Sequence, residues 1–302
     1  MSDEIWSPDL HDRSFTLGAE GGLGPKGKVT LSFRFNRLAS GYTNPDRPLG
    51  VLASRLESGQ LELWDPAQIT HKTEHVLRLW LYPVLGCFKI RHTGPVRALH
   101  FNPLQTPLLA SGSVGGELYI WYLNCKKHST HYTPGARSQR LGRISALGWN
   151  AQVAHILASS SLSGYTVIWD LRGKREVVAL QYGGVGGPVG GLGPGSGAGG
   201  VRRGVSDVAW HPDNVSFRIP TLRRNLIPTP SGNAFDYCLG GRFSTGDLRN
   251  ARAPERILQG HERGILSVSW YLQDPELLIS CGKDNRTLVW NPSSGEILGQ
   301  AR

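Results

Sequence analysis

Short apolar runs separated by turn-forming residues recur along this chain. In residues 92–121, HTGPVRALHFNPLQTPLLASGSVGGELYIW, three such runs follow one another, opened by a His and closed by a Trp. Each run lasts only a few residues before Gly, Pro, Asn or Asp ends it, which is typical of β-strands. No segment keeps a 3.6-residue apolar spacing over ten residues, so the pattern argues against helices.

The same phrase occurs again at residues 143–172 and 261–292, and half of it occurs at residues 51–66. A degenerate copy begins with GVSDVAWHPDN at residue 204 and ends with GDLRNA at residue 251. In every full copy twenty residues separate the aromatic residue that closes the first run from the Trp that closes the third: Phe101 to Trp121, Trp149 to Trp169 and Trp270 to Trp290. Repeats of this length with several short strands each predict the blades of a β-propeller.

We therefore expect an all-β WD-repeat propeller with about six recognisable or degenerate blades of an expected seven. The expected divisions are a degenerate first blade at 1–50, a half blade at 51–66, WD repeats at 92–124, 143–172 and 260–300, a Gly-rich loop at 183–200 and a degenerate repeat at 204–251. The chain stops twelve residues after Trp290. We expect an incomplete ring for that reason, and a chain that is a shortened version of a longer protein.

The recurring His and Trp predict a buried network inside each blade. In such blades a His before the first strand, a Ser or Thr on the second, an Asp in the tight turn and the Trp on the third form one hydrogen-bonded set. A catalytic role for the same residues is the alternative, but buried polar groups need partners and this set supplies them. The expected members are His92, Trp121, Trp149, Trp169, Asp170, His261, Ser269, Asp284 and Trp290. Asp65 and Asp170, which follow blade-ending Trp residues, are expected to form turns.

Composition and charge change this prediction little. The net charge is +10, which favours an anionic partner, but the arginines are scattered and no recognition helix or stacking motif accompanies them, so we expect no nucleic-acid role. The four cysteines lie at least 38 residues apart and form neither a local metal site nor a redox pair. The acidic start MSDEIWSPDL is not a secretory signal, and no apolar run is long enough to span a membrane, so we expect a cytosolic protein.

The sequence carries no motif of a known chemistry. It has no Gly-x-Ser-x-Gly, His-Glu-x-x-His or Walker motif and no clustered carboxylates. His128 and His131 lie three residues apart without a third ligand nearby, so we expect no metal site there. The sequence thus predicts a protein that is not an enzyme and needs no cofactor.

Several long stretches resemble one known family. KIRHTGPVRALHFNPLQTPLLASGSVGGELYIW, WNAQVAHILASSSLSGYTVIWDLR, DLRNARAPERILQGHERGILSVSW and DPELLISCGKDNRTLVWNPSSGEI are similar to the N-terminal WD-repeat propeller of the larger outer-cage subunit of the COPII vesicle coat, the Sec thirty-one family of protein transport proteins. WSPD at residues 6–9 resembles the start of that family, and the Gly-rich insertion is most like fungal members. The resemblance covers most of residues 45–300.

The resemblance implies a scaffold without chemistry of its own. Such a protein assembles with a small WD-repeat cage subunit into rods that build a cage over vesicles budding from the endoplasmic reticulum, and its propeller touches other propellers at cage vertices. It would be cytoplasmic, peripheral on endoplasmic reticulum membranes and COPII vesicles, and bound to the membrane only through the coat. The family's later blade, helical solenoid and Pro-rich region have no counterpart here, so direct rod assembly is not implied for this chain.

Two other functional classes stay open at this point. A WD-repeat adaptor of another class, such as a substrate receptor or a chromatin scaffold, would bind peptides through loops on one face of the same ring. An enzyme is the second rival, and the missing motifs argue against it. Because a fold alone does not define a function, the identity of the partners distinguishes these readings.

Overall fold

The computed structural model describes residues 2–5, 27–30, 35–42, 49–57, 61–67, 92–123, 130–134, 141–181, 204–212, 234–239, 242–247, 256–271 and 273–301. Within these residues it contains twenty-one β-strands. The Gly-rich loop expected at 183–200 and His128 lie outside the described residues. The structure therefore supports the predicted all-β class over the part of the chain that it describes.

Five antiparallel sheets follow one another along the chain, and we number them blades 1 to 5. Blade 1 contains β3 (Phe35–Gly41), β4 (Val51–Leu56) and β5 (Leu61–Trp64). Blade 2 contains β6 (Val96–Phe101), β7 (Leu108–Ser113), β8 (Leu118–Tyr122) and β9 (Thr130–Tyr132). Blade 3 contains β10 (Ile144–Trp149), β11 (Ile156–Ser161), β12 (Tyr165–Asp170) and β13 (Arg175–Gln181).

The two remaining blades and one small sheet complete the described structure. Blade 4 contains β14 (Val205–Trp210), β15 (Ala234–Leu239), β16 (Arg242–Asp247) and β17 (Arg256–Gln259). Blade 5 contains β18 (Ile265–Trp270), β19 (Leu278–Gly282), β20 (Thr287–Asn291) and β21 (Glu296–Ala301). A separate two-stranded sheet contains β1 (Ser2–Ile5) and β2 (Gly27–Thr30).

The structure corrects the predicted boundary at residue 50. The sequence placed residues 35–41 in a first blade of their own, but β3 pairs along its length with β4, so both belong to blade 1. Gly50, with φ of 70°, turns the chain back beside Gly41, and a Cβ at Gly50 would lie 2.6 Å from the Gly41 carbonyl oxygen. A glycine takes this backbone conformation without strain, so the two strands form a close pair.

The sequence phrase also captured only three of the four strands in blades 2 to 4. The repeats expected at 92–124, 143–172 and 204–251 end before β9, β13 and β17, respectively. These outer strands lie at the rim of the molecule, where fewer side chains are buried. β9 and β17 are short, with the sequences THY and RILQ, and β13, REVVALQ, follows the Trp that closes the repeated phrase.

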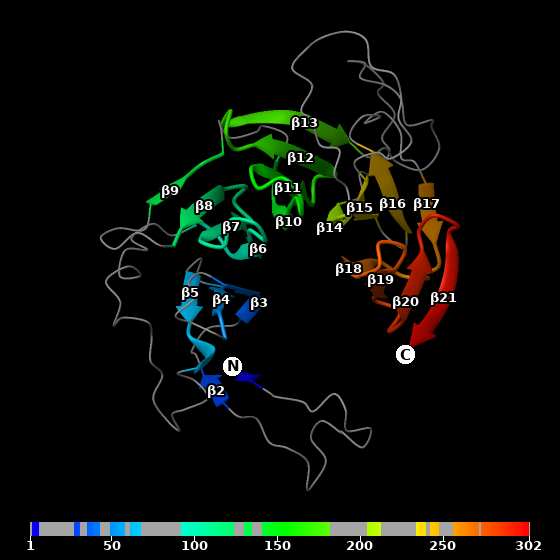
Figure 1. Cartoon of the computed structure of the whole chain (residues 1–302), viewed down its shortest axis with the longest axis horizontal. Coiled ribbons are helices and arrows are strands. Elements are labelled where there is room, and N and C mark those ends of the chain that lie inside the picture. The colour runs from blue at the N-terminus through cyan, green and yellow to red at the C-terminus, as the bar shows by residue number, and fades with distance from the viewer. Residues whose placement is uncertain are drawn as a thin grey trace, which may run out of the picture.

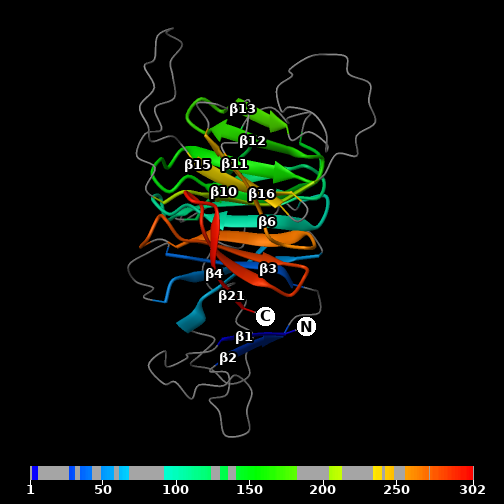
Figure 2. The ribbon, with the colours of Figure 1, turned by 90° about the vertical axis from the view of Figure 1, so that its right-hand side faces the viewer.

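The blades lie side by side around an arc. Figure 1 shows β3, β6, β10, β14 and β18 on the inner side of this arc and β13 and β21 on its outer side. Turned by 90°, the molecule shows β1 and β2 at the opposite end from β12 and β13 (Figure 2). The inner strands of successive blades are thus neighbours, as expected when β-sheets are arranged radially.

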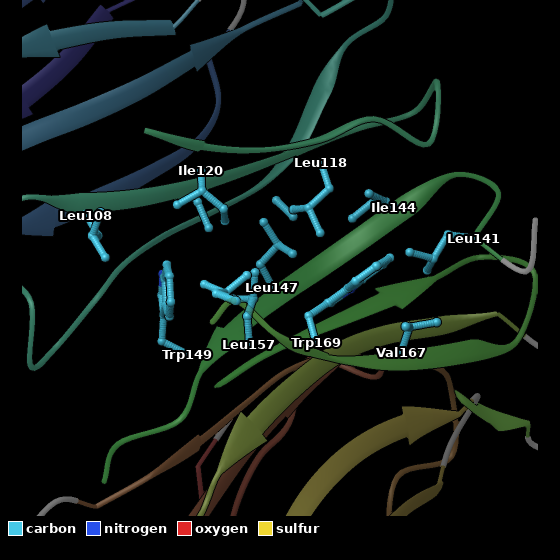
Figure 3. Close-up of a cluster of buried hydrophobic side chains, with 13 residues drawn as sticks. Leu108, Leu118, Ile120, Leu141, Ile144, Leu147, Trp149, Leu157, Val167 and Trp169 are labelled. Atoms are coloured by element: carbon cyan, nitrogen blue, oxygen red, sulfur yellow. The ribbon is translucent and has the colours of Figure 1, made fainter. Parts of the chain in front are cut away.

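The hydrophobic cores lie between the blades. One cluster joins Ala98, Leu118 and Ile120 of blade 2 to residues of blade 3, including Trp149 and Trp169 (Figure 3). Equivalent clusters join blade 1 to blade 2, blade 3 to blade 4 and blade 4 to blade 5. A blade buries its apolar faces against its neighbours, which explains why β7 and β11 are buried at every position.

Each inner strand also carries an irregularity near its start. The register between the first and second strands shifts once in every blade: between Phe35 and Arg37, Val96 and Ala98, Ile144 and Ala146, Val205 and Val208, and Ile265 and Ser267. Such β-bulges turn the extra side chain away from its usual face. They define structurally equivalent positions in the five blades.

Candidate functional site

A hydrogen bond from a Trp to a Ser recurs in four blades. In each case the indole Nε1–H donates to a serine Oγ ten residues earlier, with a donor–acceptor distance of 2.8 Å. The pairs are Trp64 with Ser54, Trp121 with Ser111, Trp169 with Ser159, and Trp290 with Ser280. These Trp and Ser side chains are buried, so the bond satisfies a polar group that packing has removed from water.

In blade 5 this bond extends into a complete four-residue network. His261 Nε2 lies 2.8 Å from Ser280 Oγ, and His261 Nδ1 lies 2.9 Å from Asp284 Oδ1. The carboxylate accepts the Nδ1 proton, which leaves Nε2 to accept the Ser280 hydroxyl proton. Burial tends to raise the pKa of Asp284, but hydrogen bonds from His261 and the Glu262 backbone N–H outweigh it and hold the pKa below its usual value.

The structure corrects the predicted serine of this network. Ser269 lies on β18 next to Trp270 and is exposed, whereas Ser280 on β19 bonds both His261 and Trp290. Adjacent residues of a strand point to opposite faces, so Ser269 faces away from the side that Trp270 packs on. The signal that could have identified Ser280 is the ten-residue Ser-to-Trp spacing, which is the same in four blades.

Blade 2 contains a variant of the network. His92 Nε2 lies 2.7 Å from Ser111 Oγ, but His92 Nδ1 faces Glu117 Oε2 at 3.3 Å. Gly115 occupies the turn position of Asp284, and the longer Glu117 side chain reaches back from two residues farther along. Burial lowers the pKa of His92 to about 4, although Glu117 partly opposes this shift. His92 is therefore neutral at pH 7. The sequence analysis missed Glu117.

In blade 3 Ser163 stands at the turn position of Asp284, and the sequence has Arg140 where blade 5 has His261. Trp169 donates to Ser159, and Ser159 Oγ donates to the Val167 carbonyl oxygen at 3.3 Å. Ser163, at the position of Asp284, bonds Ser161 through their hydroxyls at 2.6 Å. The hydrogen bonds described here join Trp169, Ser159, Ser161 and Ser163 to one another or to the backbone.

The predicted residues Trp149 and Asp170 have other roles. Trp149 Nε1–H donates to the His100 carbonyl oxygen of blade 2 at 3.0 Å, so it joins two blades instead of closing one. Trp210 likewise donates to the Gly148 carbonyl oxygen of blade 3 at 2.8 Å. Asp170 Oδ1 accepts the Arg172 N–H, and Asp65 Oδ1 accepts the Ala67 N–H, as turn-forming carboxylates do.

Serines at the bulges form a second set of contacts between blades. Ser145 Oγ donates to the Val205 carbonyl oxygen of blade 4 at 2.6 Å, and Ser206 Oγ donates to the Ile265 carbonyl oxygen of blade 5 at 2.8 Å. Both bonds run from a bulge residue to the residue that precedes the bulge in the next blade. These two bonds fix the inner strand of blade 3 against that of blade 4, and the inner strand of blade 4 against that of blade 5.

Clusters of metal-binding side chains and membrane-spanning helices are both absent from the described residues. No group of three or more His, Cys, Asp or Glu side chains within them is placed to bind a metal ion. Among the same residues, no helix has the length and apolar character needed to cross a membrane. His131 lies in β9, while its expected companion His128 lies outside the described part of the chain. The networks above bond their polar groups to one another, which is an arrangement that serves the fold.

Comparison with known proteins gives the family. Residues 252–291 match the model of the WD domain, G-beta repeat. The chain is 47% identical over 305 residues to the protein transport protein SEC31 of Mycosarcoma maydis, a match that covers 98% of this chain and 20% of that protein. The chain belongs to the SEC31 family. SEC31 of Scheffersomyces stipitis is 42% identical over 272 residues, which cover 90% of this chain and 19% of that protein.

Two solved structures that resemble this chain support its assignment to the SEC31 family. A structure titled "COPII on membranes, outer coat vertex" matches with a TM-score of 0.65 and 29% identity, over 95% of this chain and 66% of that one. A second, titled "The structure of the COPII coat assembled on membranes", has the same TM-score and identity and is covered over 36% of its length. The chain spans about a fifth of the length of the curated SEC31 relatives that it matches.

Proposed function

We propose that this chain is a non-enzymatic scaffold of the COPII outer coat that acts in vesicle budding from the endoplasmic reticulum, and so in transport from there to the Golgi. The observation that carries the proposal is its likeness, over 95% of its length, to a chain in a solved outer coat vertex. The 47% identity to a protein transport protein over nearly the whole chain supports it.

The geometry of the blades is consistent with a scaffold. The polar side chains that could suggest catalysis, such as His92, His261 and Asp284, are hydrogen-bonded within the blades. In the proposed role these networks stabilise the blades, and function belongs to the outer surfaces of the propeller. The proposed partners are other coat subunits, among them the small WD-repeat cage subunit, with propeller-to-propeller contacts at cage vertices.

The proposed location follows from these partners. The chain would be cytoplasmic and peripheral on endoplasmic reticulum membranes and COPII-coated vesicles. Its association with the membrane would be indirect, through the other coat subunits. No catalytic step, cofactor or metal ion belongs to the proposal.

The experiment that tests this function is affinity purification from cells. The chain is tagged at its N-terminus at the native locus, and co-purified proteins and the mass of the tagged product are determined. We expect coat subunits among the partners and a loss of them in a Gly282→Ala variant, in which a Cβ would collide with His261 and Asp284. Gly299→Ala is the matched control, since its Cβ meets nothing within 4 Å.

The purification also distinguishes the rival function. Recovery of a substrate receptor complex or of chromatin proteins without any coat subunit would overturn the proposal and favour an adaptor of another class. Coat subunits recovered equally with the wild type and both glycine variants would show that binding does not depend on an intact blade 5.

A further inference from the structure

One position of the inner strands differs sharply between blades. The residue directly after the bulge is Ala98 in blade 2 and Ala146 in blade 3, and both are fully buried against the next blade. In blades 1 and 5 the residue after the bulge is Arg37 and Ser267, respectively. In blade 4, where the register shift runs from Val205 to Val208, Asp207 takes the equivalent place, three residues before Trp210, as Ala98 precedes Phe101 and Ala146 precedes Trp149. Two neighbouring interfaces are thus closed by a methyl group, whereas a carboxylate takes the same place in blade 4.

Asp207 is buried and bonded mainly to blade 5. Its side chain is 4% exposed. Oδ2 accepts the Ser267 hydroxyl proton at 2.7 Å and the Val268 N–H at 3.1 Å, and Oδ1 accepts the Val208 N–H at 3.0 Å. These donors offset part of the cost of removing a carboxylate from water, and an opposite charge nearby offsets it further.

Arg37 supplies that charge from a distant blade. Its Nη2 lies 3.9 Å from Asp207 Oδ1. Along the arc, blades 2 and 3 separate blade 1, which carries Arg37, from blade 4, which carries Asp207 (Figure 1). The ion pair therefore reaches across the inner side of the arc, while every other contact between blades described above joins neighbours.

We propose that Arg37 and Asp207 form a cross-arc clamp that fixes the curvature of the blade arc. Neighbour-to-neighbour contacts each allow a small change of angle, and such changes add up along an arc of several blades. A contact between blades 1 and 4 removes this accumulated freedom directly. The clamp is a property of the fold and holds independently of the proposed coat function.

The two side chains of the clamp differ in how firmly they are held and in their exposure to solvent. Asp207 is held in place by Ser267 and Val268, so its position is fixed by blade 5. Arg37 is 42% exposed, so its approach to Asp207 is weakened by salt, which screens charges in contact with solvent. The clamp should accordingly loosen at high ionic strength, whereas the hydrogen bonds of Asp207 should persist.

The test measures the distance between blades 1 and 4 by electron–electron resonance. Spin-labelled unnatural amino acids replace Glu57 and Ile257, both of which are exposed. We compare the full chain with Arg37→Met, which keeps an unbranched stem and removes the charge, and with Asp207→Asn, which keeps an acceptor for the blade 5 donors. Arg97→Met is the matched control, because Arg97 is an exposed arginine at the bulge of β6.

We expect the distribution of label-to-label distances to be broader in Arg37→Met and in Asp207→Asn than in the wild type. The double variant should be no broader than either single variant. In 1 M salt the wild type should broaden to the same extent. Arg97→Met should keep the width of the wild type. In urea unfolding, the Arg37–Asp207 pair should show a coupling of about threefold in the unfolding equilibrium constant. Equal widths in all proteins, or equal broadening by Arg97→Met, would overturn the clamp.

Discussion

Blades 3 and 5 carry the same strand pattern, but their second strands have different surroundings. In β11 of blade 3 all six residues are buried, whereas in β19 of blade 5 buried and exposed residues alternate. Ala158 of β11 is fully buried, and the equivalent Ile279 of β19 is 37% exposed. Blade 3 packs on blade 2 with one face and on blade 4 with the other, while the described contacts of blade 5 are with blade 4.

This difference teaches that burial in a propeller is decided by the neighbour. Leu278, Leu288 and Trp290 of blade 5 face blade 4 and are buried as deeply as their counterparts in blade 3. The alternate residues of the same strands, including Ile279, are apolar too, yet they retain contact with water. The apolar residues of a strand are thus buried only where another sheet packs against them.

The largest expected effect comes from the face on which the two blades differ. Ile168 of β12 is fully buried between blades 3 and 4, so Ile168→Ala should lower the free energy of unfolding by about 3 kcal/mol. Val289, at the same position of β20, is only half-buried, and Val289→Ala should cost less than about 1 kcal/mol. Urea unfolding of both variants measures the difference, and equal losses would show that the outer face of blade 5 is covered in solution.

The polar networks of the two blades should also respond differently to an added methyl group. Gly282 leaves no room for a Cβ beside His261 and Asp284, so Gly282→Ala should cost about 2 kcal/mol by breaking buried hydrogen bonds. Blade 3 has Ser161 at this position and no His–Asp pair to break. Thermal unfolding, with Gly299→Ala as the neutral control, checks this expectation. If Gly282→Ala lowers the free energy of unfolding no more than Gly299→Ala does, the His261–Asp284 network does not stabilise blade 5.

Acid should loosen the attachment of blade 3 more than that of blade 5. Burial, with a smaller contribution from Arg37, lowers the pKa of His100 to about 4. The Nδ1 atom of His100 accepts a hydrogen bond from the backbone N–H of Trp149 in blade 3. A lowered histidine pKa means that the unfolded chain binds more protons between pH 6.5 and 4, so stability is complete above pH 6.5 and declines as the pH falls towards 4. In blade 4 the equivalent residue, on the side of blade 5, is Ala209, which does not titrate.

A His100→Gln variant measures this contribution. Between pH 7 and 4.5 it should lose about 2 kcal/mol less stability than the wild type, in denaturant unfolding at each pH. His92, whose pKa is also about 4, titrates over the same range in both proteins and cancels in the comparison. Parallel pH profiles for the two proteins would contradict the assignment of acid sensitivity to His100.

The smallest expected difference concerns the serines of the two networks. Ser280→Ala removes the partner of both Trp290 and His261, whereas Ser159→Ala removes the partner of Trp169 alone. Each buried group left without a partner costs about 1 kcal/mol or more, so Ser280→Ala should be the more destabilising by about 1 kcal/mol. Chemical unfolding of the two single variants gives this difference. A larger loss for Ser159→Ala would reverse the ranking of the networks.

The inner strands of the blades were predictable because their apolar residues are buried on both faces. The spacing from Phe101 to Trp121, repeated in blades 3 and 5, identified them from the sequence, and the resemblance on these strands led to the family that the comparisons show. The outer strands β9, β13 and β17 were missed. They lie beyond the Trp or turn that closes the repeated phrase, at distances along the chain that differ from blade to blade.

The polar details were less predictable for a related reason. Ser269 and Ser280 are both serines near a Trp, and only the pairing of β19 with β20 shows that Ser280 faces Trp290. In blade 2 the carboxylate that faces His92 comes from Glu117, two residues beyond the position that Asp284 holds in blade 5. The longer Glu side chain spans this distance, and a motif that requires Asp at a fixed position does not detect it. Asp207 resembles any charged residue in sequence, and its significance appears only where Arg37 of a distant blade approaches it.

The placement of the cores between blades has a consequence for how the chain reaches its native state. Because each cluster of buried side chains belongs to two sheets, a single blade has no core of its own, and the smallest unit able to hold together is a pair. Folding would then resemble the growth of a stack, in which the first pair is the costly nucleus and each later sheet joins a surface already formed. A damaged sheet would interrupt that growth and leave two shorter stacks.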